Sequence, residues 1–189
     1  MNKSKIAGIA FNVPDNIVTN HDLEKMMDTT DEWIQTRSGI KERRWVKPGV
    51  ANSDLALPAC QEAIQNAGIS PDDIDAIVVG TVTSDFNFPG MAPIIQQKLG
   101  ISAHVPAYDI SAACSAFIYL LEIGDQYIKS GKYNNILLVG SDIMSTIIER
   151  TPEGRATGVL FGDGSGAVVL QASNDDSGIL STHLFADGK

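Results

Sequence analysis

Asp109-Ile-Ser-Ala-Ala-Cys-Ser-Ala-Phe-Ile118 is the stretch from which the fold and the chemistry of this chain are best inferred. The apolar run that ends at Ile110 is typical of a buried strand, and the small residues after it predict a tight turn. A helix is expected from Cys114 to about Ser130, where Gly131 offers a C-terminal cap. Cys114 is therefore expected at the head of a helix, where backbone N–H groups have no partner within the helix.

Two interpretations of Cys114 follow from this position. The N-terminus of a helix carries a partial positive charge that favours a thiolate, and its N–H groups can hold a developing oxyanion. The helix that follows is apolar nearly all round in its first half, so we expect it to be buried. Cys114 would then be a nucleophile at the floor of a pocket. The alternative is a small core residue, because cysteine is among the most buried residue types.

Composition narrows the class of protein. The chain has 189 residues, of which 43% are hydrophobic and 20% charged, as is usual for a globular protein. A net charge of -9 argues against nucleic acid as the main partner. No apolar run approaches the roughly eighteen residues of a membrane span, and the N-terminus lacks a signal peptide's apolar core, so we expect no membrane association. The two cysteines, Cys60 and Cys114, make a disulfide framework unexpected and fit a cytoplasmic location. No zinc-ligand spacing is found, so no metal is expected.

Strand and helix patterns alternate along the chain. Apolar runs bounded by turn residues predict strands over 5–11, 76–80, 105–110, 135–140, 167–172 and 178–185. Capping residues and apolar periodicity predict helices over 31–38, 53–67, 92–99 and 114–130, with Ser53 as the N-cap of the second and Cys60 in its core face. This alternation indicates an α/β layered fold with a mostly parallel sheet.

Two further features suggest contacts with other molecules. A basic and aromatic cluster stands out in an acidic chain: Trp33, Arg37, Lys41, Arg43, Arg44 and Lys47. It is either a solvated surface, the usual fate of a charge run, or a landing site for a phosphorylated ligand on which Trp33 stacks. In the polar loop after residues 76–80, Phe86 and Phe88 either anchor a partner subunit or pack locally.

Five motifs stand in a fixed order: Thr29-Thr-Asp-Glu-Trp-Ile-Gln-Thr-Arg-Ser-Gly-Ile-Lys-Glu-Arg43, Ala112-Ala-Cys-Ser-Ala-Phe117, Leu137-Leu-Val-Gly-Ser-Asp142, Leu160-Phe-Gly-Asp-Gly-Ser-Gly166 and Gly178-Ile-Leu-Ser-Thr-His-Leu184. With these motifs the chain closely resembles the N-terminal half of the β-ketoacyl-acyl-carrier-protein synthase III family, which is part of the thiolase superfamily. The resemblance implies a thiolase-like fold, in which residues 1–189 form the nucleophile-bearing half of a duplicated, layered αβαβα architecture with a mostly parallel mixed sheet.

The resemblance also implies an activity. Members of the family are acyltransferases that initiate fatty-acid synthesis. Acetyl or another short acyl group moves from coenzyme A to the cysteine, and malonyl-acyl-carrier protein then loses carbon dioxide and attacks the thioester. Acyl-coenzyme A is thus a substrate, and neither a permanently bound cofactor nor a metal is implied.

Six positions of this sequence match functional positions of the family. Cys114 matches the acyl-accepting nucleophile. Trp33 matches the residue that stacks on the adenine of coenzyme A, while Arg37 and Arg155 match residues that hold its nucleotide end. Thr29 also lines that site. Phe88 matches a phenylalanine that reaches into the acyl pocket of the neighbouring subunit in a homodimer.

The chain departs from the family in one respect. The resemblance places the catalytic His and Asn, and a glycine that completes the oxyanion hole, in a C-terminal half that this chain does not contain, and His21, His104 and His183 match no catalytic position. We therefore expect a piece of a longer synthase, inactive alone in condensation. The alternatives are a related acyltransferase of secondary metabolism, a hydroxymethylglutaryl-coenzyme A synthase, or a non-catalytic half-domain that binds coenzyme A or a partner. The acyl-chain preference stays open.

Overall fold

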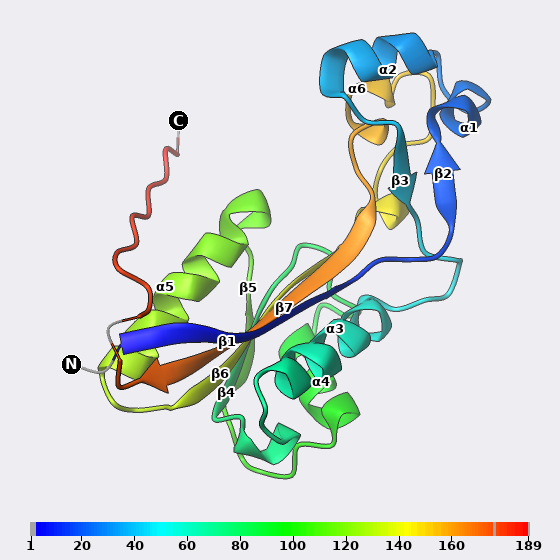
Figure 1. Cartoon of the computed structure of the whole chain (residues 1–189). Helices are drawn as coiled ribbons and strands as arrows, with labels where there is room; N and C mark the ends of the chain where they lie inside the picture. Colours follow the sequence, from blue (N-terminus) through cyan, green and yellow to red (C-terminus); the bar gives the residue numbers. More distant parts are fainter. Residues whose placement is uncertain (1–2, 176, 189) are drawn as a thin grey trace. The chain divides into compact units, whose positions relative to one another are not determined.

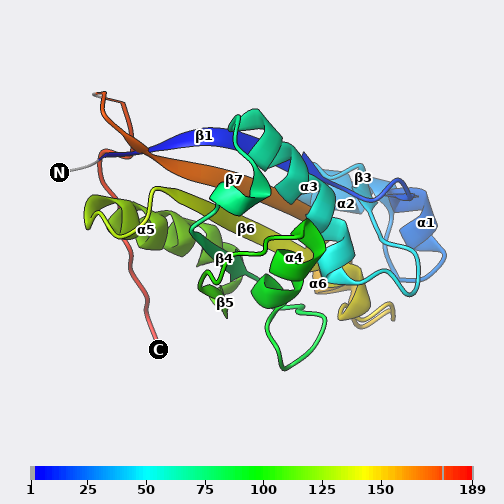
Figure 2. The same cartoon turned by 90° about the horizontal axis from the view of Figure 1, so that it is seen from below.

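The computed structural model describes residues 3–175 and 177–188, and these residues form two compact units (Figures 1 and 2). The first unit comprises the described residues within 1–12, 51–141 and 165–188. The second comprises residues 13–50 and 142–164. Each unit is built from segments distant in sequence and has a hydrophobic core of its own.

The first unit is organised around a five-stranded sheet. Its strands lie in the order β1 (Lys3–Asn12), β7 (Asp163–Ser173), β6 (Asn135–Ile143), β4 (Ala76–Gly80) and β5 (Ala107–Ile110). β4 pairs in parallel with both β5 and β6, whereas β1 pairs antiparallel with β7. All five residues of β4 are buried, as expected of a strand covered on both faces. The predicted α/β fold with a mostly parallel mixed sheet is confirmed.

Helices cover both faces of this sheet. Ile77 and Val79 of β4 pack in one core with α3 (Asn52–Asn66) and α4 (Met91–Leu99). Val78 packs in a second core with α5 (Ala116–Lys129). Because successive side chains of a strand point to opposite faces, α5 lies on one face and α3 and α4 lie on the other, as Figure 1 shows. Short 3-10 turns precede β4 and α5, namely η1 (Pro71–Asp73) and η2 (Ala113–Ser115).

The second unit is smaller. A two-stranded antiparallel sheet, β2 with β3, is accompanied by three helices and a 3-10 turn: β2 (Ile17–Thr19), α1 (Asn20–Glu24), α2 (Asp31–Ser38), β3 (Glu42–Arg44), η3 (Met144–Thr146) and α6 (Arg155–Gly158). Its core includes Leu23, Ile34 and Val159. The hydroxyl of Thr30 accepts the Trp33 N–H and so caps α2, whose bounds are those predicted for this helix.

Three expectations about local structure are wrong. No strand forms among the described residues of 178–185: Ile179 donates one backbone hydrogen bond to Ser4, but Leu180 and Phe185 are each 87% exposed. A strand needs a ladder of partners, and a single bond does not provide one. The N-cap of α3 is Ala51 instead of Ser53, whose hydroxyl and N–H both donate to Asp85.

The third wrong expectation is that α5 is buried all round. The helix meets the sheet along one side, where Leu120 and Ile128 are fully buried. Ile118, on the first turns of the same helix, is 49% exposed. In the part of the chain that the structure describes, no helix is both long and apolar enough to cross a membrane.

The close approach of β1 to α3 gives a stability prediction. A Cβ added at Gly8 would lie 2.0 Å from the carbonyl oxygen of Ala63, so Gly8→Ala should lower the free energy of unfolding by about 3 kcal/mol or more. Gly166→Ala is the matched control, because a Cβ there meets nothing within 4 Å, and its effect should stay below about 1 kcal/mol. Urea unfolding of the wild type and both variants measures these changes in the free energy of unfolding. Equal stability of the two would contradict the packing described.

Candidate functional site

The turn between β5 and α5 presents Cys114. This residue lies in η2 and its side chain is exposed. The preceding residue, Ala113, has a φ of +45°, the one non-glycine residue with a positive φ among residues 3–175 and 177–188. A left-handed backbone costs an alanine about 1 kcal/mol, so the surrounding packing must hold the turn in this conformation. Cys114 therefore sits at the head of the helix, as predicted, one 3-10 turn before the α-helical residues begin.

Gly80 and Ala116 provide part of that packing. Gly80 is the last residue of β4, and a Cβ built on it would lie 2.8 Å from the Cβ of Ala116. Real side chains do not approach so closely, so a glycine at this position lets the first turn of α5 rest directly on the end of the strand. Ala116 is 4% exposed, and the residue is thus enclosed where the helix begins.

Asp109 ties the end of β5 to another helix. Its carboxylate accepts hydrogen bonds from the N–H of Met91, at 2.5 Å, and of Ala92, at 2.7 Å. These are the first two residues of α4, where a negative charge is favourable because of the helix dipole. Local sequence patterns do not reveal this cap, because Asp109 lies 18 residues after Met91 and 17 after Ala92.

Asn52 joins the ends of two parallel strands. Its amide nitrogen donates to Thr81 Oγ1 at 3.1 Å and to the Ser141 carbonyl at 3.0 Å, and its amide oxygen accepts the Ser141 hydroxyl at 2.5 Å. Thr81 follows β4 and Ser141 lies near the end of β6, so both belong to the carboxyl edge of the sheet. The turn that carries Cys114 leaves β5 at the same edge, where ligand sites of parallel sheets gather.

A hollow of about 590 Å³ opens beside this edge. It is lined by the loop after β4, the start of α4 and the residues from Ala107 to Ser111. Phe88, in that loop, is 89% exposed and Phe86 is 62% exposed. Local packing, one of the two interpretations of these phenylalanines, is thus wrong for Phe88 within the described chain.

In the second unit, Trp33 lies close in space to two arginines, one of which follows it by four residues and the other by more than a hundred. The guanidinium carbon of Arg155 is 4.7 Å from the centroid of the Trp33 ring, and that of Arg37 is 5.7 Å away. Arg155 also donates to the carbonyl of Asp28 at 2.8 Å, which holds α6 against the segment before α2. Thr29 follows Asp28, and its hydroxyl oxygen is buried without a hydrogen-bond partner. Four residues predicted to bind the nucleotide are therefore neighbours in one unit.

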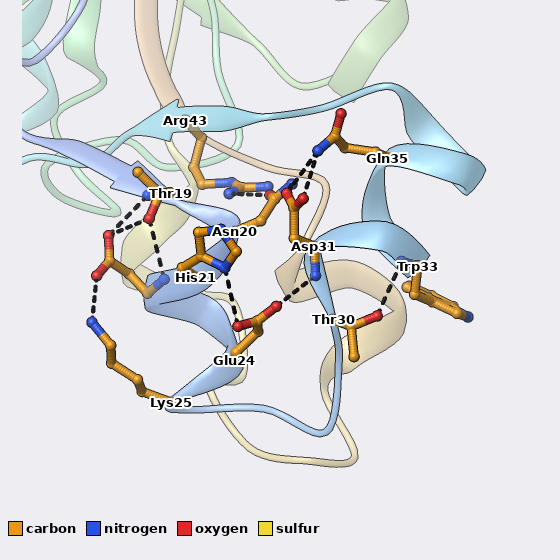
Figure 3. A network of polar contacts seen from close by, with 11 residues as sticks. Thr19, Asn20, His21, Glu24, Lys25, Thr30, Asp31, Trp33, Gln35 and Arg43 are labelled. Carbon is orange, nitrogen blue, oxygen red and sulfur yellow. Dashed lines mark hydrogen bonds and ion pairs between the residues drawn. The ribbon is translucent and has the colours of Figure 1, made fainter.

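A polar network positions the helix that carries Trp33 (Figure 3). The amide nitrogen of Asn20 donates to the Asp31 carboxylate at 2.9 Å and to the Ile40 carbonyl at 2.7 Å, while its oxygen accepts from Arg43 at 2.8 Å. Hydrogen bonds from Asn20 and Gln35 hold the pKa of Asp31 below its usual value. Figure 3 shows the Trp33 indole pointing away from this network.

Arg43 belongs to the framework and not to a ligand site. It is 6% exposed, and its guanidinium donates to the carbonyl of Val159 at 2.9 Å as well as to Asn20. Burial lowers its pKa. The interpretation of the whole basic cluster as a landing site is therefore wrong for Arg43, whose charge serves internal carbonyl and amide oxygens.

The other cysteine and the three histidines lie in ordinary core and surface environments. Cys60 is fully buried, as predicted for a core residue, and burial raises the pKa of its thiol to about 12. His21, His104 and His183 are all exposed. Within the described residues, no group of three or more His, Cys, Asp or Glu side chains could hold a metal ion.

Comparison with known proteins identifies relatives. The family model of 3-oxoacyl-[acyl-carrier-protein] synthase III matches residues 108–188. The β-ketoacyl-[acyl-carrier-protein] synthase III 1 of Bacillus anthracis is 49% identical over 183 residues, which are 97% of this chain and 58% of that protein. The enzyme of the same name from Vibrio vulnificus is 50% identical over 186 residues, again 58% of its length.

Solved structures agree with the sequence matches. The 3-oxoacyl-[acyl-carrier-protein] synthase III of Aquifex aeolicus superposes with a TM-score of 0.93 at 46% identity, covering 98% of this chain and 59% of that one. The synthase III of Thermus thermophilus gives a TM-score of 0.91 at 38% identity, covering 97% and 56%. The chain thus spans a little more than half the length of the relatives that it matches. The resemblance inferred from the five motifs is confirmed: over almost its whole length, this chain is related in sequence and in fold to the β-ketoacyl-[acyl-carrier-protein] synthase III family.

Proposed function

We propose that this chain carries the acyl-accepting site of an acyltransferase that initiates fatty-acid synthesis. A short acyl group would move from acyl-coenzyme A to Cys114. The observation that carries the proposal is the exposed Cys114 in the strained turn at the head of α5, in a chain whose relatives are named β-ketoacyl-acyl-carrier-protein synthase III.

The proposed step is thioester exchange. The thiolate of Cys114 attacks the carbonyl carbon of acyl-coenzyme A, and the tetrahedral intermediate then expels the coenzyme A thiolate, which leaves the acyl group on Cys114. The positive end of α5 would stabilise the oxyanion of the intermediate. The exposure of Cys114 supports this role, because a thioester must reach the sulfur, whereas the buried Cys60 offers no such access.

The nucleotide end of coenzyme A would bind in the second unit. The proposed contacts are stacking of adenine on Trp33 and ion pairs of Arg37 and Arg155 with phosphate, with Thr29 lining the same place. The Arg155 guanidinium carbon lies only 4.7 Å from the Trp33 ring centroid, so a flat ring cannot enter between them unless Arg155 moves. Stacking on the face of Trp33 that Arg155 covers therefore requires Arg155 to give up its present position.

The later steps extend the same proposal. Residues 1–189 would act as the nucleophile-bearing half of a thiolase-like enzyme, and condensation with malonyl-acyl-carrier protein would follow acylation. Phe88 would enter the acyl pocket of a second subunit in a homodimer. Its 89% exposure supports this role, since an aromatic side chain that is largely exposed can bind a partner.

Intact-mass spectrometry after incubation with acetyl-coenzyme A tests the proposal. The wild-type chain should gain one acetyl group, and Cys114→Ala should gain none, while circular dichroism shows that both are folded. Trp33→Ala should acetylate roughly tenfold more slowly at low acetyl-coenzyme A, since stacking on an aromatic ring contributes about 1–3 kcal/mol. Lys41→Gln is the matched surface control and should behave as wild type. An adduct that persists in folded Cys114→Ala, or none on folded wild type, would refute the proposed step.

The two cysteines should differ in reactivity. Cys114 is exposed, whereas Cys60 is fully buried with a pKa raised to about 12, so iodoacetamide should modify one thiol in the native chain and two after unfolding. Cys114→Ala should then take up no label in the native state. Rapid labelling of Cys60 in the native chain would show that the α3 core is not closed as described.

A further inference from the structure

A hollow in the second unit is not used by the proposed acyl transfer. It has a volume of about 610 Å³ and lies between the segment from Trp45 to Val50 and the segment around η3. Its walls combine apolar side chains with two cations, Lys47 and Arg150. None of the residues that line it is one of the residues proposed to bind coenzyme A.

Arg150 is held in position at the wall of this hollow. Its guanidinium carbon lies 4.6 Å from the centroid of the Trp45 ring, and one nitrogen donates to the Ser145 carbonyl at 2.6 Å. Trp45 is 6% exposed and its indole N–H donates to the Phe161 carbonyl, so the ring is itself fixed. A guanidinium has five N–H donors, and the single bond to Ser145 leaves others for a ligand.

The charges at the hollow are uncompensated. Neither Lys47 nor Arg150 forms an ion pair with a carboxylate in the part of the chain that the structure describes, and the described lining contains no Asp or Glu. The buried carboxylate of Asp163 accepts hydrogen bonds from two residues that line the hollow: from the Val46 N–H at 2.7 Å and from both the N–H and the hydroxyl of Ser145. In a chain with a net charge of -9, two cations that line one hollow and form no ion pair among the described residues favour an anion.

The apolar part of the lining limits the kind of anion. Val46, Val50 and Ile148 line the same hollow as the two cations. Val50 is 38% exposed, so a ligand that covers it gains hydrophobic contact. A phosphate ion alone would leave the apolar side chains exposed to water. An anion with an apolar body would contact both the cations and the apolar side chains.

We infer that this hollow binds a small amphipathic carboxylate, with the carboxylate against Arg150 and Lys47 and a short alkyl chain against Val46, Val50 and Ile148. The planar fork of a guanidinium matches a carboxylate with two parallel hydrogen bonds. This site is independent of Cys114 and Trp33, and so it does not rest on the proposed acyl transfer.

Octanoate is the probe, and the Trp45 indole N–H signal in a nitrogen-15 correlation spectrum is the readout. The chain has two tryptophans, so Trp33→Phe assigns the signal. Octanoate should shift the Trp45 signal with saturation, whereas neutral 1-octanol and inorganic phosphate should bind at least about tenfold more weakly, because each satisfies only one kind of wall.

Three charge-neutralising variants locate the site. Lys47→Gln and Arg150→Gln should each weaken octanoate binding about tenfold, and the exposed Lys41→Gln, which does not line the hollow, should leave it unchanged. Lys47 is exposed, so its variant decides the question if Arg150→Gln does not fold. The inference is overturned if octanoate does not shift the Trp45 signal, if phosphate binds as tightly as octanoate, or if Lys47→Gln binds like wild type.

Discussion

The candidate site depends on how closely α5 approaches the end of β4. A Cβ on Gly80 would lie 2.8 Å from the Cβ of Ala116, which is too close for two side chains. Because glycine has no side chain, Ala116 can pack directly against the backbone of Gly80. The helix therefore begins directly above the carboxyl edge of the sheet, and the chain must reach it from β5 within a few residues. The positive φ of Ala113 is the consequence, because a short connection leaves the backbone no relaxed path. Cys114 is exposed at the end of that connection.

Two polar contacts keep the same edge of the sheet in register. Asp109 binds the first two N–H groups of α4, and Asn52 links the loop after β4 to the end of β6. Buried polar groups of this kind are costly unless every partner is present, so they favour one arrangement of the strand ends over others. In the second unit, the two terminal nitrogens of the buried Arg43 guanidinium join β3 to Asn20 and Val159, while its Nε is buried without a hydrogen-bond partner.

Local patterns in the sequence predicted the elements whose cause is local. The continuous apolar run over residues 76–80 is a fully buried strand, and the small residues before Cys114 do form a tight turn. The five motifs, which extend over both units, also predicted the resemblance to the synthase III family that the comparisons found. By contrast, the segment over 178–185 has the composition of a strand but lacks a ladder of partners in the described structure.

The features that sequence reasoning missed all depend on contacts between distant residues. In sequence, Arg43 looks like a surface charge. In the structure its guanidinium donates a hydrogen bond to the carbonyl of Val159, which lies 116 residues later. In sequence, Asn52 looks like an ordinary loop residue, and only the structure shows its hydrogen bond to Ser141. The positive φ of Ala113 is also not predictable from sequence, because alanine rarely adopts it. The pairing of Trp33 with Arg155 is likewise invisible in local pattern; the resemblance to the family assigned both residues to one site, and the structure places them together.

The central claim is that the contact between Gly80 and Ala116 sets the position of the proposed nucleophile. The most direct measurement is the rate at which acetyl-coenzyme A acetylates Cys114 in Gly80→Ala, followed by intact mass. Gly140→Ala is the matched control, since Gly140 is the register partner of Gly80 and a Cβ there would lie 3.5 Å from Phe117, an ordinary contact. The account predicts a rate at least about tenfold lower for Gly80→Ala and a nearly unchanged rate for Gly140→Ala, because small displacements of a reacting group cost large factors in rate. Equal rates in the two folded variants would contradict it.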